Sequence, residues 1–334
     1  MKRALIIANT GTPDSPRPED VRAYLKSFLS HPRIVPTNPL LWKVILNGFI
    51  LRKRSVASSR KYETIWSGDG FKFPHDMKEL ADKLEGSYAA SGDDVVVRYA
   101  MSFGKPSIES VMKSVREEGC ERLSVLPLYP QNAFSQAFIV ADQVKECASR
   151  TGWGGSYEII GDYSDNETYL RAIADSIRAA GFDASDGDRI IMGFHSIPKV
   201  DIEHGDTYDV TTARTCEWLA KELGIPDEQG ARGFMCRFDK KRTWLEPYSP
   251  EVIDKWWYEC FEGRLFYVCP NFSIDCLETY YDVVGVLQVM WRGRMLARDV
   301  KPRKDLFVYV PCLGASDRHV DVVRDVVDNP SRFL

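Results

Sequence analysis

The sequence predicts an α/β protein with doubly wound parallel sheets, and two observations carry that prediction. Short apolar runs rich in β-branched residues alternate with longer segments in which apolar residues recur at the helical period. Strands that are apolar throughout are typical of parallel sheets that helices cover on both faces. The chain has 334 residues, which is enough for two domains.

The predicted strands are six runs of Val, Ile, Leu and aromatic residues that begin near residues 4, 94, 122, 189, 264 and 305. In open parallel sheets ligands bind beyond the carboxyl ends of the strands, so residues directly after these runs are candidates for a site. The predicted helices are the amphipathic segments 20–29, 76–85, 108–118, 166–180 and 210–223.

A polar stretch at residues 181–189 marks the predicted domain boundary. We therefore expect a first lobe over residues 1–180 and a second lobe over residues 181–313. The apolar run at the N-terminus ends within a few residues, which is too short for a membrane span, and it is predicted to be the first strand.

Charge and cysteine content restrict the possible partners and compartment. Lys and Arg number 44 against 48 Asp and Glu, so no basic field predicts nucleic-acid binding. The eight cysteines include no C-x-x-C pair, and reduced thiols in a cytoplasmic protein are expected.

His195 is the first candidate for chemistry. It follows the apolar run 189–194, and Pro198 turns the chain away soon after it, so the imidazole is expected at the carboxyl end of a strand. A histidine there can exchange a proton near neutral pH. When His195 is considered alone, the sequence supports a structural role at least as well as a catalytic one.

Three acids form the second candidate. Asp275, Glu278 and Asp282 are spaced i, i+3 and i+7, which would place all three on one face of an α-helix. Neighbouring carboxylates suit a proton relay, here assigned to Asp282, or the capture of a cation. The alternative is a solvated acidic helix start that complements the helix dipole.

The segment 39–54 carries large apolar residues followed by Arg52, Lys53 and Arg54. A core helix is one interpretation. The other is an apolar lip that contacts lipid or an apolar substrate while the three cations meet anionic groups. The turn at Gly11 lacks the G-x-G-x-x-G pattern, so no nucleotide cofactor is predicted.

The order of motifs resembles the ferrochelatase family, whose members insert ferrous iron into a porphyrin. The resemblance covers nearly the whole chain, and its most specific part is the pairing of FHSIP at 194–198 with DCLET at 275–279. Further matching segments are NTGTPDSPRPEDVRAYLKSFL from residue 9, LPLYPQ from residue 126, GDTY from residue 205, RTWLEPYS from residue 242 and VPCLG from residue 310.

The resemblance implies two similar Rossmann-like lobes around a central cleft. The first lobe carries the apolar lip, and the C-terminal helix of about residues 314–334 completes this lobe. It implies that His195 and Glu278 contact the metal and that Asp275 assists them. It also implies the substrate-binding residues Thr10, Tyr208 and Trp244, to which we add Arg52, Lys53 and Arg54 as partners for propionates.

The activity implied is that of a lyase of haem biosynthesis, inserting Fe²⁺ into protoporphyrin IX or coproporphyrin III without a cofactor. No iron–sulfur cluster is expected, because Cys312 is the last cysteine of the sequence. A cytoplasmic enzyme with peripheral membrane contact is expected. Two alternatives stay open: a sister chelatase for another metal or tetrapyrrole, and a non-catalytic tetrapyrrole or haem carrier.

Overall fold

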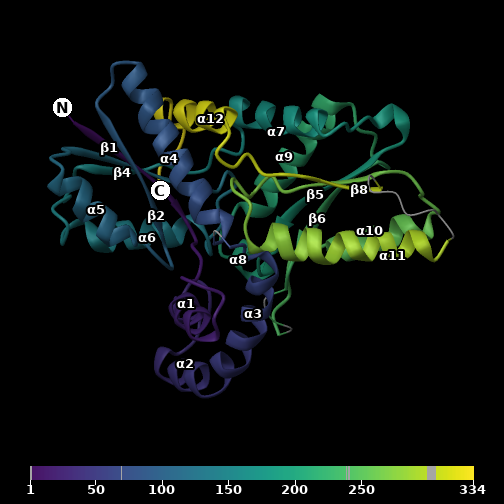
Figure 1. Ribbon diagram of the computed structural model, residues 1–334, viewed down its shortest axis with the longest axis horizontal. Coiled ribbons are helices and arrows are strands. Elements are labelled where there is room, and N and C mark those ends of the chain that lie inside the picture. The colour runs from purple at the N-terminus through teal and green to yellow at the C-terminus, as the bar shows by residue number, and fades with distance from the viewer. Residues whose placement is uncertain (1, 69, 238, 240, 299–305) are drawn as a thin grey trace. The chain divides into compact units, whose positions relative to one another are not determined.

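The computed structural model describes residues 2–68, 70–237, 239, 241–298 and 306–334. The chain divides into two units, one comprising Met1–Asp162 with Val323–Leu334 and the other comprising Tyr163–Val322 (Figure 1). Each unit contains a four-stranded parallel sheet, and the predicted α/β class with two doubly wound lobes is confirmed.

The boundary between the units differs from the one expected near residue 180. Helix α7 (Glu167–Ala179) belongs to the second unit, where the Tyr169 hydroxyl donates a hydrogen bond to the Pro270 carbonyl oxygen at 2.8 Å. The polar stretch 181–189 is therefore a turn inside the second unit, where Asp188 accepts a hydrogen bond from the amide of Asp183.

The first unit has the strand order β2-β1-β3-β4, with β1 in a central position. All three pairings are parallel, and β1 pairs with β2 and β3 along nearly its whole length. Strand β4 was not predicted, because it is only three residues long. The strands are β1 (Arg3–Asn9), β2 (Val95–Met101), β3 (Arg122–Pro127) and β4 (Tyr157–Ile159).

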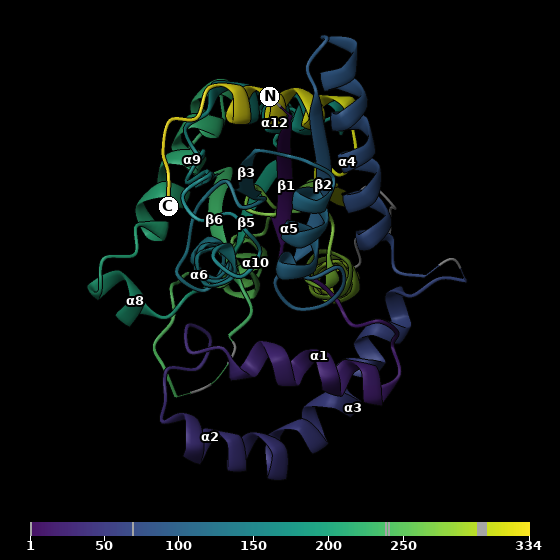
Figure 2. The ribbon, with the colours of Figure 1, turned by 90° about the vertical axis from the view of Figure 1, so that its left-hand side faces the viewer.

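Helices cover both faces of this sheet, as Figure 2 shows for α4 and α5. On one face Met112 and Val144 pack against Ile6, and the Trp153 indole donates to the Met112 carbonyl oxygen at 2.8 Å. The helices are α4 (Lys72–Ala90), α5 (Ile108–Glu117) and α6 (Ala137–Ala148), joined by the part of α12 (Asp317–Asp328) that belongs to this unit.

An arm of helices follows β1. Its second helix starts at an Asn38 cap, whose side chain accepts hydrogen bonds from the amides of Leu40 and Leu41. No residue of this second helix is buried, so it is not a core helix, whereas Leu46 and Leu51 further along the segment 39–54 are buried. The arm consists of α1 (Pro18–Ser30), α2 (Pro39–Ile45), the π-helix η1 (Leu46–Ile50) and α3 (Leu51–Ile65).

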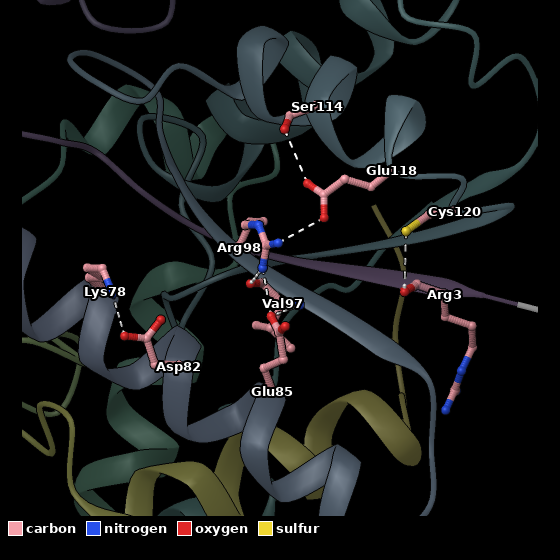
Figure 3. Close-up of polar contacts among 9 residues, drawn as sticks. All are labelled: Arg3, Lys78, Asp82, Glu85, Val97, Arg98, Ser114, Glu118 and Cys120. Carbon is pink, nitrogen blue, oxygen red and sulfur yellow. Dashed lines mark hydrogen bonds and ion pairs between the residues drawn. The ribbon is translucent and has the colours of Figure 1, made fainter.

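Side chains cover the outer edge of β2. Glu85 accepts hydrogen bonds from the Val97 amide at 3.0 Å and from the Arg98 guanidinium at 2.7 Å, and Arg98 also pairs with Glu118 (Figure 3). Such charged cover protects an edge strand from pairing with another chain. A cavity of about 490 Å³ lies beside it, lined by Lys78, Ala81, Asp82, Val97, Arg98, Tyr99, Pro106, Ser110, Val111 and Ser114, and none of these is a predicted site residue.

The second unit has the strand order β6-β5-β7-β8, again all parallel. Helices α7 and α9 lie on one side of the sheet, and α10 and α11 lie on the other (Figure 1). The elements are β5 (Arg189–His195), β6 (Gly230–Met235), β7 (Leu265–Val268), β8 (Phe307–Val310), α8 (Lys199–Glu203), α9 (Tyr208–Leu223), α10 (Ser249–Tyr258), α11 (Gln288–Leu296), the 3₁₀ turn η2 (Ala184–Asp186) and the π-helix η3 (Glu278–Leu287).

Candidate metal centre

His195 is the last residue of β5, the strand that lies second in the sheet order of the second unit. The side chain is half-buried, and Nδ1 lies 2.7 Å from the carbonyl oxygen of Ser196. A carbonyl oxygen only accepts, so Nδ1 donates, and the neutral ring then carries its lone pair on Nε2. A hydrogen bond from the ring nitrogen that does not face the metal is the usual way in which a protein orients a metal-binding imidazole.

The turn after His195 is held by backbone and side-chain hydrogen bonds. The Ser196 amide donates to the Met235 carbonyl oxygen at 3.0 Å, and the Ser196 hydroxyl donates to the Leu245 carbonyl oxygen at 2.9 Å. The chain therefore leaves the sheet in a fixed direction at the carboxyl end of β5, where the sequence predicted a ligand site.

The acids do not lie on one α-helical face, which corrects the expectation from their spacing. Glu278 is the first residue of η3 and Asp282 lies inside it, whereas Asp275 lies in the loop before the helix. The element is a π-helix of ten residues. Its i to i+5 hydrogen bonds give a wider turn than the α-helix on which the i, i+3, i+7 argument rests, and π-helical segments are frequent at functional sites.

Each acid has a hydrogen-bond donor that sequence analysis missed. The Tyr309 hydroxyl donates to Asp275 Oδ1. The thiol of Cys276 lies 3.1 Å from Glu278 Oε2, and the thiol of Cys236 lies 3.1 Å from Asp282 Oδ2. These donors orient the three carboxylates without adding a positive charge.

The thiols belong to a group at the carboxyl edge of the second sheet. Cys236 follows β6, Cys269 follows β7, and Cys312 lies shortly after β8. Burial raises the pKa of Cys269, Cys276 and Cys312 well above the usual thiol value, and nearby carboxylates raise it further. These three thiols are therefore protonated at neutral pH and can act as donors.

All eight cysteines are free, and Cys260 is the one that is exposed. Their positions relative to the strand ends are the signal that could have revealed the group, since the carboxyl ends of parallel strands share one edge. The sequence alone offered no pattern because the thiols are far apart along the chain.

Two predicted substrate-binding residues are buried in the second unit. Tyr208 is 0% exposed, and Trp244 is 4% exposed with its indole donating to the Asp239 carbonyl oxygen at 3.0 Å. Trp244 also forms a β-bridge with Pro198, which supports the turn after His195. Neither the Tyr208 ring nor the Trp244 ring lies on an open surface. Their direct contact with substrate stays a prediction.

The remaining predicted substrate-binding residues belong to the first unit. Thr10 follows β1, and its hydroxyl forms a hydrogen bond with that of Tyr129. On α3, Arg52 and Lys53 are exposed, and Arg54 is half-buried. Their contact with substrate also stays a prediction.

Among the residues that the structure describes, no three His, Cys, Asp or Glu side chains are arranged to hold a metal ion together. His195 and Glu278 are therefore candidates for metal contact as individual ligands. The site supplies an imidazole lone pair and three oriented carboxylates on the segments that follow β5 and β7.

The comparisons with known proteins concern the family of the whole chain. A family model described as Ferrochelatase matches residues 2–330. A ferrochelatase of Aromatoleum aromaticum is 35% identical over 329 residues, covering 98% of this chain and 87% of the relative. A ferrochelatase of Nitrosococcus oceani is 33% identical over 324 residues, covering 97% of this chain and 85% of the relative.

Two solved structures share the fold at low sequence identity. SirB from Bacillus subtilis, solved with Fe³⁺, has a TM-score of 0.54 and 13% identity, and the match covers 98% of this chain and 97% of that one. DR2241 from Deinococcus radiodurans, described as similar to chelatases, has a TM-score of 0.53 and 11% identity, and the match covers 99% of this chain and 55% of that one.

The chain has a two-lobed α/β fold, and the family match identifies it as a metal chelatase, a class of lyase. The sequence relationships then settle the family. The chain belongs to the ferrochelatase family, as its motifs indicated.

Proposed function

We propose that this enzyme inserts Fe²⁺ into a porphyrin, protoporphyrin IX or coproporphyrin III, as a step of haem biosynthesis. The observation that carries the proposal is the lone pair of His195 Nε2 at a strand end, in a unit whose acids are oriented by neutral donors. A porphyrin must lose two pyrrole protons as the metal enters, so the reaction needs a base and acceptors for those protons.

In this proposal His195 takes a pyrrole proton, and Glu278 and Asp282 accept protons and pass them to solvent. Both carboxylates lie on η3, so they form a short path along one element. The reaction is balanced: one Fe²⁺ enters the ring, two protons leave it, and no electron is transferred. No nucleotide or redox cofactor is needed for this step.

The iron is a substrate and must be released to the ring. Fe²⁺ accepts imidazole and carboxylate ligands. His195 Nε2 and Glu278 would bind it first with few protein bonds, and an incomplete ligand set favours transfer over storage. Once the iron has passed to the ring, the Nε2 lone pair is free to take a pyrrole proton. The thiol of Cys276, which donates to Glu278, orients that carboxylate while leaving its second oxygen for the metal.

The test is anaerobic incubation of the purified protein with Fe²⁺ and each porphyrin, following the loss of free-porphyrin fluorescence. Wild type is expected to turn over, and His195→Ala is expected to lose activity. The exposed His75 of the first unit provides a matched control, and His75→Ala is expected to keep wild-type turnover. Tight porphyrin binding without turnover by wild type would instead support the carrier, and faster insertion of another metal would support a sister chelatase.

We also propose that the enzyme contacts membranes peripherally through the arm of the first unit. Leu40, Val44 and Phe49 are 78%, 67% and 73% exposed, and the cations Arg52 and Lys53 follow them. Apolar side chains beside cations suit the surface of an anionic bilayer. None of the helices in the described ranges combines the length and apolar character that crossing a bilayer requires.

Sedimentation with anionic phospholipid vesicles tests this contact. Phe49→Glu is expected to reduce the bound fraction, whereas Leu296→Glu, at an exposed apolar position of α11, is expected to leave it unchanged. Equal binding by wild type and Phe49→Glu would contradict the proposal.

A further inference from the structure

Asp275 lies in a loop, and no helical hydrogen-bond pattern fixes its position. It precedes η3, which begins at Glu278, yet its side chain is only 6% exposed. A carboxylate in such a position needs a partner to hold it, because a buried charge without a hydrogen bond is strongly unfavourable.

Tyr309 of β8 provides that partner. Its hydroxyl donates to Asp275 Oδ1 and also lies 3.6 Å from the sulfur of Cys312. Burial raises the pKa of Tyr309 well above its usual value, so the hydroxyl keeps its proton. The carboxylate therefore receives its hydrogen bond from a rigid ring on a strand.

A backbone hydrogen bond joins the same two segments. The amide of Gly314, in the loop after β8, donates to the carbonyl oxygen of Ser273 at 2.9 Å, two residues before Asp275. The end of β8 and its following loop thus support the segment that carries the acid at two points.

We propose that Tyr309 is a positioning residue that fixes the Asp275 carboxylate for metal insertion. It occupies Oδ1 and leaves Oδ2 as the oxygen that meets the metal or a proton. This role rests on the proposed function, because it concerns the same site. Tyr309 itself acts through Asp275 and does not touch the reacting atoms.

The neighbouring strand supplies a matched control. Tyr267 of β7 is the register partner of Tyr309 in the parallel pairing of β7 with β8. Its hydroxyl hydrogen bonds with that of Ser249 at 2.7 Å, and within the described part of the chain no hydrogen bond joins it to Asp275. Tyr267→Phe therefore removes a buried hydroxyl one strand away without loosening Asp275.

The experiment compares metallation kinetics of Tyr309→Phe, Tyr267→Phe and wild type. Removing a hydrogen bond to a charged group is expected to lower the kcat of Tyr309→Phe by about tenfold or more, with the KM for porphyrin changed by less than about twofold. Tyr267→Phe is expected to keep kcat within about twofold of wild type. An unchanged kcat in Tyr309→Phe would overturn the proposal.

A double-mutant cycle separates positioning from a general structural role. If Tyr309 acts through Asp275, the double variant Tyr309→Phe with Asp275→Asn should be no slower than Asp275→Asn alone. Fully additive losses would overturn the proposal. If Tyr309→Phe does not fold, Tyr309→His, which keeps a ring N–H donor, takes its place: turnover above that of Asp275→Asn supports positioning, and equal turnover contradicts it.

The wild-type assay distinguishes a failure of the proposed function from a failure of the proposed role of Tyr309. Absence of metallation by wild type would refute the proposed function. Metallation by wild type with an undiminished rate in Tyr309→Phe would refute the role of Tyr309 and leave the proposed function intact.

Discussion

Gly193 lies directly against the ring of Tyr267. A Cβ atom at residue 193 would come within 2.3 Å of the Tyr267 hydroxyl oxygen and 2.4 Å of a ring carbon. The two residues are on the adjacent strands β5 and β7, and Tyr267 is fully buried. Glycine is therefore required at this position for the ring to cross β5 two residues before His195.

Gly193→Ala is expected to destabilise the protein by about 1–3 kcal/mol or more, because an added methyl group in a packed core forces the strands apart. Urea unfolding measures the change. Gly86, inside helix α4, provides the control, since a Cβ there meets nothing within 4 Å. Gly86→Ala should be neutral or stabilising by up to about 1 kcal/mol.

Acid should weaken the native state through His319. Burial lowers the pKa of His319 from 6.5 to about 4, and its Nδ1 faces the Gly314 carbonyl oxygen. The unfolded chain binds a proton at this histidine near its normal pKa, so its contribution is complete above about pH 6.5 and is lost as the pH falls towards about 4. This contribution is about 3 kcal/mol.

Urea unfolding at several pH values checks the loss, with His319→Asn for comparison. The variant should have a smaller drop in unfolding free energy between about pH 7 and about pH 4.5 than wild type. Identical pH dependences would show that His319 does not titrate as its burial implies.

The buried carboxylate of Asp188 is paired with the guanidinium of Arg264. Asp188 is 2% exposed, and the guanidinium of Arg264 donates to its two oxygens at 2.8 Å and 2.6 Å. Arg264→Ala leaves a buried carboxylate without its counter-ion, and we expect a loss of roughly 2–4 kcal/mol, allowing for the partial exposure of Arg264.

Thermal or urea unfolding of Arg264→Ala tests this dependence. Arg178→Ala removes an exposed arginine that also pairs with acids, Asp175 and Glu222, and should cost less than about 1 kcal/mol. Similar losses in the two variants would contradict the difference that burial predicts.

Glu278→Gln should slow metallation more than it weakens porphyrin binding. The substitution keeps the size of the side chain and removes the charge that receives metal or proton, so kcat should fall by about tenfold or more while the Kd for porphyrin changes little. Stopped-flow metallation and fluorescence titration measure the two quantities. Equal losses in both would mean that Glu278 serves substrate binding.

The sequence predicted the strands that consist of a continuous apolar run. Runs such as the one ending at His195 are apolar because both faces of the sheet are covered, and six of the eight strands in the described part of the chain were recognised from them. Strand β6 was missed because Gly230 and Gly233 interrupt its apolar character. Gly233 is needed for packing, since a Cβ there would lie 2.7 Å from the hydroxyl oxygen of Ser249.

The sequence predicted which charged residues belong to the candidate site, but it did not predict how they are arranged. The sequence identified Glu278 and Asp282, but the helical period assumed for them was that of an α-helix, and nothing local distinguishes the π-helix η3 that forms. The role of Tyr309 could not be seen, because its contact with Asp275 joins residues far apart in sequence. The burial of Tyr208 likewise depends on tertiary packing.

The unequal exposure of the thiols allows one cysteine to be labelled selectively for spectroscopy. Cys260, near the end of α10, is the exposed cysteine, whereas Cys269 is buried and Cys276 and Cys312 are only partly accessible. A maleimide dye should therefore attach first at Cys260 of the unmodified protein. Single-molecule or quenching measurements of metal loading could then use a native attachment point, with the thiols beside the carboxylates left unreacted.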